Sequence, residues 1–302
     1  MSLRARILKE HARQSMKNAV TSPILVTLVF ILLTTVLVEA VYTFIPQTTS
    51  NDLLSGNWLF LFLSILLSLY QSVMEFGYSC WSLSVADGQD EGIPSLLDGF
   101  GMVGRVLLMR VRIFLGILGR GMLLFFSYIL LITSLAAMSS ASLGLMLMLV
   151  ASLIFYAALI SLTLRYSLAP FVLCDHPEAG SLVAVHRSIE LMHRHIWAMV
   201  KLYLSFWPWY LLQMVLTLVV AVVTLGPTLS TLPELYVSAD PDALSIALNT
   251  VINSVLSSPL ISLSLLPIQL FLQPYQNISL AHFYRTLSQQ SGSQSFAGSG
   301  LS

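Results

Sequence analysis

The hydrophobic residues of this chain form long, nearly uninterrupted blocks separated by short polar connections. Six blocks reach about 20 residues or more, the length at which an α-helix crosses the hydrocarbon core of a bilayer. The pattern predicts an all-α, polytopic membrane protein with six transmembrane helices. Their expected positions are about residues 24–45, 58–85, 113–138, 143–173, 196–225 and 251–284.

The sixth block is longer than one span requires. Ala243–Tyr284 contains no Asp, Glu, Lys or Arg, but it contains Pro259, Pro267 and Pro274. A continuous helix over this block would be about 60 Å long, twice the hydrocarbon thickness, and each proline removes a backbone donor. We expect an outer or re-entrant piece, followed by a kinked spanning helix that ends near Tyr284.

Composition agrees with a membrane location. Hydrophobic residues make up 56% of the 302 positions and charged residues only 9%, with fourteen Lys and Arg balanced by fourteen Asp and Glu. A typical soluble domain has about 25% charged residues. The composition excludes an ordinary soluble enzyme, a disordered chain and a nucleic-acid-binding protein with a basic face.

The basic residues are confined to alternate connections. All fourteen precede the first block, lie between the second and third or just inside the third, surround the connection from the fourth to the fifth, or follow the sixth. Residues 46–57, 139–142 and 226–242 contain none. The positive-inside rule then places both termini in the cytoplasm. We treat residues 1–287 as one membrane domain and the Ser/Gly-rich residues 288–302 as a flexible cytoplasmic tail.

A basic, amphipathic segment precedes each odd-numbered block. Before the fifth block, Leu182, Val185, Ile189 and Met192 recur at helical spacing. We expect three such helices to lie at the membrane interface, with the apolar face in lipid and the basic face toward anionic headgroups. The candidate headgroup contacts are Arg6, Lys9, Arg13, Lys17, Arg187 and Arg194.

Similar tyrosine-containing triplets close the even-numbered blocks. They are centred on Tyr78, Tyr166 and Tyr275. One interpretation is a threefold internal repeat, with a unit of about 90 to 110 residues. The alternative is that tyrosine is simply common at membrane interfaces.

Charges inside the apolar blocks are the most informative functional feature. Glu75, Arg120 and Arg165 lie at similar depth on three spans, near the predicted cytoplasmic side. A charge in hydrocarbon is costly unless it finds a partner or water. We expect Glu75 to pair with Arg120 or Arg165, in a cluster that handles substrate or protons. The alternative is that the arginines extend to lipid phosphates and Glu75 merely pairs with one of them.

Aromatic residues surround Pro208 in the fifth block. A kink there could border a cavity for an acyl chain or a peptide, and ordinary helix packing is the alternative. The candidate cavity-lining residues are Tyr203, Trp207, Trp209 and Tyr210.

The remaining chemistry-bearing residues predict little. Cys80 and Cys174 are expected to be free, reduced thiols on the cytoplasmic side. The histidines at 186, 193 and 195 have no completing ligand set for a metal, so headgroup contact is the better interpretation. We expect a solvated acidic loop at Asp87, Asp90 and Glu91. No catalytic motif is present, and we expect no cofactor and no enzyme activity.

Several short stretches resemble a bacterial integral-membrane family known only as domain of unknown function number 975. They are Leu8–Arg13, Leu96–Phe100, Leu164–Ala169, Asp175–Glu178, Arg187–Met192, Pro274–Tyr275 and Ala281–Arg285. The resemblance covers nearly the whole chain and implies a six-span helical protein of the bacterial cytoplasmic membrane. It brings no reaction or substrate. This chain departs from the family where it has acidic residues after the second span.

Two functions remain. The first is a transport or export component for a lipid, a peptide or a small amphiphile, which the intramembrane charges and the proline-broken sixth block favour. The second is a non-transporting membrane organiser or regulator that binds anionic lipid or a partner protein. Membrane lipids are the expected partners in both.

Overall fold

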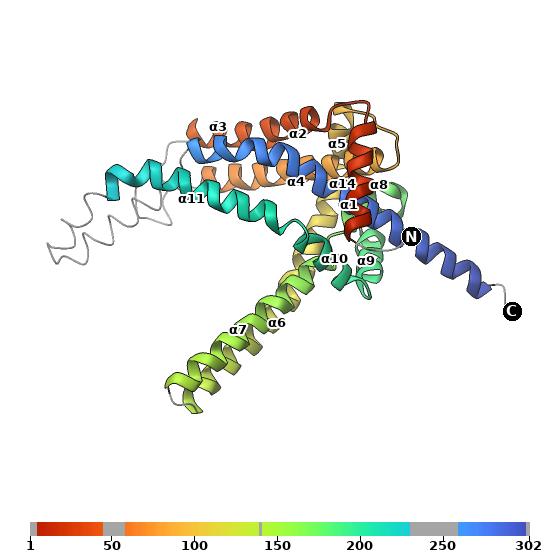
Figure 1. Cartoon of the computed structure of the whole chain (residues 1–302). Helices are drawn as coiled ribbons and strands as arrows, with labels where there is room; N and C mark the ends of the chain where they lie inside the picture. The colour runs from red at the N-terminus through yellow and green to blue at the C-terminus, as the bar shows by residue number, and fades with distance from the viewer. Residues whose placement is uncertain (1–4, 45–57, 139–140, 230–258, 300–302) are drawn as a thin grey trace. The chain divides into compact units, whose positions relative to one another are not determined.

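The computed structural model describes residues 5–44, 58–138, 141–229 and 259–299. Those residues are almost entirely helical and contain no strand (Figure 1). Their elements are α1 (Ala5–Asn18), α2 (Pro23–Ile31), the π-helical η1 (Leu32–Val36), α3 (Leu37–Phe44), α4 (Trp58–Ala86), the 3₁₀ η2 (Ile93–Leu97), α5 (Asp98–Gly101), α6 (Val103–Met138), α7 (Ala141–Leu164), α8 (Ala169–Asp175), the 3₁₀ η3 (Pro177–Ala179), α9 (Gly180–Met192), α10 (Ile196–Leu204), α11 (Trp207–Leu229) and α14 (Pro259–Ser299).

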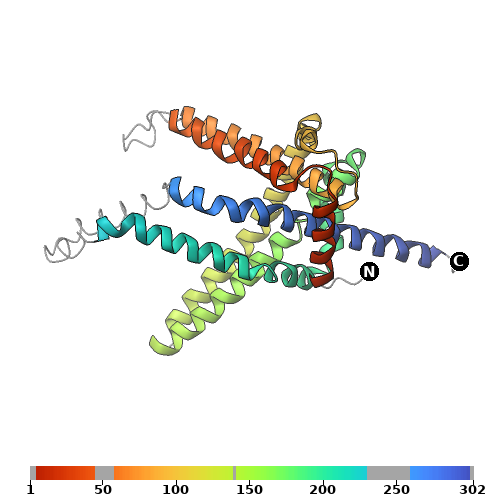
Figure 2. The same cartoon turned by 45° about the horizontal axis from the view of Figure 1, so that its top comes forward.

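The chain divides into two compact units. The first comprises Met1–Lys201 with Tyr275–Ser302, and the second comprises Leu202–Pro274. In the first unit α2 and α3 run beside α4, and α6 and α7 run side by side as a helical hairpin (Figures 1 and 2).

Four described helical stretches are long and apolar enough to cross a membrane. They are Pro23–Val41, Phe60–Ala86, Val103–Ser134 and Met146–Asp175. A fifth span results if α10 and α11, which are bent by 45° at residues 205–206, count as one. These stretches overlap with the first five predicted spans, although the third begins ten residues earlier than predicted, and they are compatible with a multi-pass membrane protein.

The predicted sixth span is not among these stretches. Residues 251–258 lie outside the described residues, and α14 then runs from Pro259 without interruption through Pro267 and Pro274. The helix also continues past Tyr284 to Ser299. The segment that we expected to be a flexible tail is therefore helical as far as Ser299.

Prolines begin helices at three of the breaks. Pro23, Pro170 and Pro208 each occupy the first turn of α2, α8 and α11, where the missing N–H would have no partner in any case. The bend that we predicted at Pro208 accordingly falls just before it, at residues 205–206.

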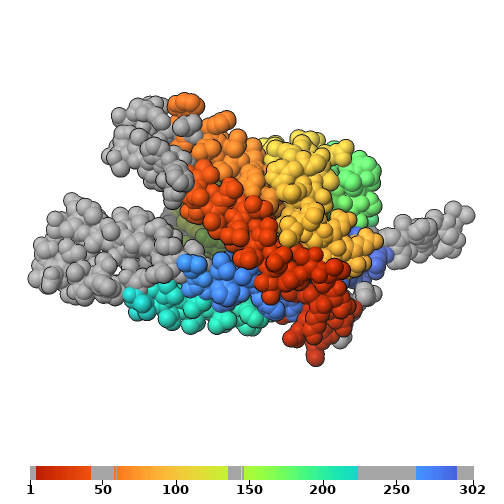
Figure 3. Space-filling model, turned by 90° about the horizontal axis from the view of Figure 1, so that it is seen from above, coloured from red at the N-terminus to blue at the C-terminus, as the bar shows by residue number. Residues whose placement is uncertain are grey.

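The buried core of the first unit centres on α4. Phe76, Tyr78 and Trp81 are almost completely buried, and the Tyr78 hydroxyl lies 2.8 Å from the Thr27 hydroxyl of α2. The segment η2–α5 packs unusually close to α4. A Cβ at Gly77 would overlap the Leu96 carbonyl oxygen, and one at Gly99 would lie 2.6 Å from the Val73 carbonyl oxygen. Figure 3 shows α2 lying against η2.

The α1 helix contacts protein through the face that we expected to enter lipid. Leu8 and Ala12 are buried, and α1 packs on α4. Ser15 Oγ lies 2.9 Å from His282 Nε2 of α14, and the His11 and His282 rings are 5.9 Å apart. The apolar face of α1 is therefore satisfied by helix packing.

The α9 helix buries part of the predicted apolar face. Val185 and Met192 are buried, whereas Leu182 is 52% exposed. The small residues Ser181, Ala184 and Ser188 are also buried, and α9 packs on α6 and α8. The face that we expected to enter lipid is therefore partly covered by protein.

Candidate functional site

A pocket of about 380 Å³ lies between α6 and α7, inside two of the stretches that could cross a membrane. Its walls combine aliphatic side chains with two arginines and two serines: Arg120, Leu123, Leu124, Ser127, Ala158, Ser161, Leu162 and Arg165. We call this the arginine pocket. It brings together two of the three residues that we predicted to form an intramembrane charge cluster.

Local structure around Tyr166 positions Arg120. The α7 helix ends at Leu164, and Tyr166 lies in the four-residue turn before α8. Arg120 Nη1 donates a hydrogen bond of 2.9 Å to the Tyr166 hydroxyl. Gly116, one turn before Arg120, leaves room for that hydroxyl, because a Cβ there would lie only 2.5 Å from it.

Arg165 is fixed through its backbone. Its carbonyl oxygen accepts a hydrogen bond of 2.8 Å from Ser188 Oγ of α9. Its guanidinium Nε is buried and has no hydrogen-bond partner. A buried donor without a partner carries a desolvation cost of about 1–3 kcal/mol, which a ligand oxygen could remove.

Glu75 does not join this pocket, which corrects our predicted pairing. Its Oε2 lies 2.5 Å from Arg110 Nη2, in an ion pair between α4 and α6. Among the described residues neither Arg120 nor Arg165 has a carboxylate within 4.0 Å. Two guanidinium groups therefore border one small pocket without an acidic counterpart.

Two further arginines of α6 hold the α9 region. Arg105 Nη1 donates to the Pro177 carbonyl oxygen at 3.0 Å, and Arg112 Nη1 donates to Ser181 Oγ at 2.5 Å. Both acceptors are uncharged, so these contacts position η3 and α9 beside α6 without neutralising the arginines.

The predicted headgroup residues of α1 have different surroundings. Arg6 is paired with Glu10 at 3.4 Å, and Arg13 and Lys17 are exposed. Lys9 lies 5.7 Å from the centre of the Tyr275 ring, and burial lowers the pKa of Lys9. Lys9 is therefore a contact within the protein as much as a surface charge.

The other two headgroup candidates lie on α9 and in the turn that follows it. Arg187 and Arg194 line a groove with the three histidines of the same segment. Among the described residues no group of three or more His, Cys, Asp or Glu side chains has an arrangement that could hold a metal ion.

Of the four aromatic candidates, Trp207 alone lines the hollow that the structure describes at the bend between α10 and α11. A hollow of about 400 Å³ at the bend between α10 and α11 is lined by Trp207 together with Leu204, Ser205 and Pro208. Trp209 instead contacts the Phe271 ring at 5.4 Å. Tyr203 and Tyr210 do not line that hollow. Helix packing, the alternative that we considered, accounts for Trp209.

An ionic cluster that the sequence did not suggest joins α14 to the ends of α4 and α8. Arg285 Nε donates to Asp87 Oδ1 and Arg285 Nη1 donates to Asp175 Oδ1, each at 2.8 Å. The Tyr284 hydroxyl donates to the other oxygen of Asp175 at 2.8 Å. Asp90 also has structural partners, because it accepts from the backbone N–H groups of Thr21 and Gly92. The predicted solvated acidic loop is thus largely engaged.

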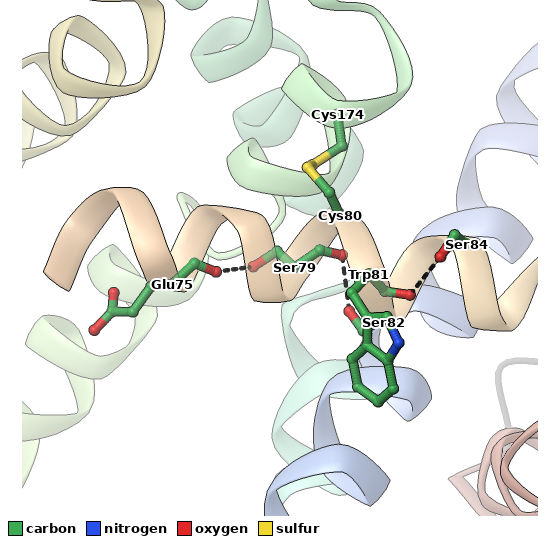
Figure 4. The surroundings of a disulfide bond; sticks show 7 residues. All are labelled: Glu75, Ser79, Cys80, Trp81, Ser82, Ser84 and Cys174. Atoms are coloured by element: carbon green, nitrogen blue, oxygen red, sulfur yellow. Dashed lines mark hydrogen bonds between the residues drawn. A yellow bond between two sulfur atoms is a disulfide. The ribbon is translucent and has the colours of Figure 1, made fainter. Parts of the chain in front are cut away.

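The two cysteines are joined, which corrects our expectation of free thiols. Cys80 of α4 and Cys174 of α8 form a disulfide, with Cα atoms 5.5 Å apart. Figure 4 shows the bond on one side of α4 and the Trp81 ring on the other. Cys174 directly precedes Asp175, so the disulfide and the ionic cluster connect the same helix ends.

Comparison with known proteins identifies the family of this chain. The model of a family described as "Protein of unknown function (DUF975)" matches residues 3–291. No curated protein and no solved structure matches the chain.

Proposed function

The chain belongs to the DUF975 family, and we propose that it is a six-span protein of the bacterial cytoplasmic membrane. In this proposal the protein binds an anionic amphiphile in the arginine pocket and takes part in the transport or export of that amphiphile. Both termini lie in the cytoplasm in this proposal, and the protein has no enzymatic activity. The single observation that carries it is the pair of arginines, Arg120 and Arg165, that border one pocket between two apolar helices.

Electrostatics favours an anionic ligand. Uncompensated charges are costly at membrane depth, so they are retained where they meet a ligand, water or a lipid headgroup. Guanidinium groups bind phosphate or carboxylate with two parallel hydrogen bonds. The hydroxyl groups of Ser127 and Ser161 offer further donors at the same pocket.

The surroundings favour an amphiphile over a soluble anion. The side chains of Leu123, Leu130 and Leu153 on the hairpin are 67–71% exposed in the protein, so an acyl chain could lie along them. A ligand with a charged head and an apolar tail would match both parts of this surface.

The alternative is a membrane organiser or regulator that binds anionic lipid or a partner without moving it. The exposed Arg13 and Lys17 of α1 favour this second function. It differs from the first in one measurable respect, since it predicts binding without transfer of lipid between leaflets.

Lipid exchange in vesicles separates the two. The purified chain is reconstituted with fluorescent phosphatidylglycerol or phosphatidylcholine, and dithionite reports the rate at which labelled lipid reaches the outer leaflet. We expect the wild type to accelerate exchange of phosphatidylglycerol, and Arg120→Gln with Arg165→Gln to abolish the acceleration. Arg13→Gln with Lys17→Gln removes the same charge from α1 and serves as the matched control.

The same vesicles define the contrary results. Exchange no faster than in protein-free vesicles would overturn the transport role and leave the organiser. Acceleration that survives loss of both pocket arginines would overturn the assignment of the pocket. Accessibility labelling of single cysteines at Ser50, Ser140 and Ser238 (expected outside) and at Ser2 and Ser295 (expected inside), in a chain with Cys80→Ser and Cys174→Ser, tests the six-span topology.

A further inference from the structure

A second hollow of the first unit lies between α14 and the α9 helix with the turn that follows it. It has a volume of about 890 Å³ and is lined by residues 186, 187, 189–191 and 193–195 with Leu287 and Gln290. We call it the basic groove. It shares no residue with the arginine pocket, and its two walls come from segments about 100 residues apart in the sequence.

Basic side chains outnumber acidic ones in the basic groove. Two arginines and three histidines line it, against one carboxylate. That carboxylate, Glu190, lies 3.0 Å from Arg187 on the same helix. Arg194 is exposed and has no ion pair with any described residue. The groove therefore keeps a guanidinium available to an anion.

Two of the histidines are oriented by backbone carbonyl groups of α9. His186 Nδ1 lies 3.2 Å from the Leu182 carbonyl oxygen, and His195 Nδ1 lies 3.0 Å from the Leu191 carbonyl oxygen. A carbonyl oxygen can only accept, so Nδ1 is the protonated nitrogen in each ring. The second nitrogen, Nε2, is thereby left to meet a ligand: it accepts from a P–OH group when neutral and donates to P–O⁻ when protonated.

We propose that the basic groove is a binding site for a phosphate group. Phosphate has several acceptor oxygens, which match the forked donors of a guanidinium and the ring nitrogens of imidazole. The shared chemistry fits two sources, the headgroup of an anionic phospholipid or free inorganic phosphate. Leu182 and Trp197, which flank the groove residues in sequence, are 52% and 69% exposed, as expected where a helix meets the acyl boundary of a membrane.

Phosphate binding to the purified full-length chain tests the proposal. The protein is kept in a neutral detergent, and the probes are inorganic phosphate and dihexanoylphosphatidylglycerol, each followed by ³¹P line broadening. We expect wild type to bind at least one probe, and His193→Gln with Arg194→Gln to weaken that binding about tenfold or more, because a guanidinium contact and an imidazole contact are removed. Arg13→Gln with Lys17→Gln should bind as wild type does.

The arms separate the sources and the sites. Binding of the lipid probe alone assigns the groove to a headgroup, binding of inorganic phosphate alone assigns it to the free ion, and mutual competition assigns it to the phosphate that both share. The lipid probe can also enter the arginine pocket, so the groove is measured in a chain that carries Arg120→Gln and Arg165→Gln. Binding that is lost when His193→Gln and Arg194→Gln are added to this chain belongs to the groove, so failure here is distinct from failure of the proposed transport. The proposal would be overturned if neither probe binds to the wild type. It would also be overturned if a His193→Gln, Arg194→Gln variant that unfolds at the wild-type temperature still binds fully.

Discussion

Arg120 Nη1 lies 2.9 Å from the Tyr166 hydroxyl, and the contact depends on the missing side chain at position 116. Gly116→Ala should lower the unfolding temperature, because its Cβ would displace Tyr166 and cost about 1–3 kcal/mol by overpacking. Thermal unfolding in detergent measures this. Gly119→Ala is the matched control: nothing lies within 4 Å of a Cβ there, and alanine is the better helix former by about 1 kcal/mol. Equal stabilisation of both variants would show that Tyr166 does not occupy this position.

A second glycine tests the close approach of η2 to α4. Gly77→Ala would place a Cβ in overlap with the Leu96 backbone carbonyl, which cannot move aside as a side chain can. We expect a larger loss of stability than for Gly116→Ala, with α5 released from α4. Faster amide hydrogen exchange within residues 93–101 would report that release, and unchanged exchange would contradict the packing described.

The Glu75–Arg110 ion pair predicts coupling between these two residues. The side chains are 55% and 34% exposed, so we expect a coupling free energy of about 1 kcal/mol at most. A double-mutant cycle with Glu75→Gln and Arg110→Gln measures it by thermal or denaturant unfolding. The cycle that combines Glu75→Gln with Arg120→Gln should be additive within about 0.5 kcal/mol. Coupling in the second cycle but not in the first would restore the pairing that the sequence suggested.

Arg285 is paired with two carboxylates, so replacing it should lower the free energy of unfolding more than replacing either carboxylate does. Arg285→Gln leaves Asp87 and Asp175 without their cation, at side-chain exposures of only 28% and 19%. We expect about 2 kcal/mol of destabilisation, below the 3–5 kcal/mol of a fully buried pair because water still reaches the site. Asp87→Asn should cost less, since Arg285 keeps Asp175. Equal stability of the two variants in chemical unfolding would argue against the shared cluster.

Reduction should destabilise the wild type selectively. The disulfide closes a loop with a sequence separation of 94 residues, for which chain-entropy arguments give about 4.7 kcal/mol. Dithiothreitol should lower the unfolding temperature of the wild type and leave a Cys80→Ser, Cys174→Ser variant unaffected. Two reactive thiols in the native, unreduced protein would contradict the bond.

The apolar blocks predicted most helices because the length of a hydrophobic run is a direct physical requirement of a bilayer. Helix ends were harder to predict. Our third span began at residue 113, whereas α6 begins at Val103. The ten additional helical residues bring Arg110 beside Glu75, which explains why a depth argument selected the wrong arginine. The turn at Tyr166 has no proline or glycine of its own, and we did not take Pro170, two residues after the turn, as a sign that the helix is broken there.

Non-local pairings were beyond the sequence pattern. Arg285 and Asp175 are 110 residues apart, and nothing in either neighbourhood indicates the other. The cysteines were assigned as free from their expected compartment, since reducing cytoplasm disfavours disulfides. The structure contradicts that assignment, because α4 and α8 pack together and bring the two Cα atoms to a separation that a disulfide spans. The two arginines of the arginine pocket were predicted from the sequence because charged residues are easily recognised within an apolar run.

The Cys80–Cys174 bond also changes the covalent topology of the molecule. It makes a closed ring of the backbone from α4 through η2, α5 and the whole α6–α7 hairpin to α8, so both walls of the arginine pocket belong to one macrocycle. A protease that cuts once inside this ring leaves a single covalent molecule, whereas one cut outside it releases a fragment. The hairpin can therefore be nicked without being lost until the bond is reduced.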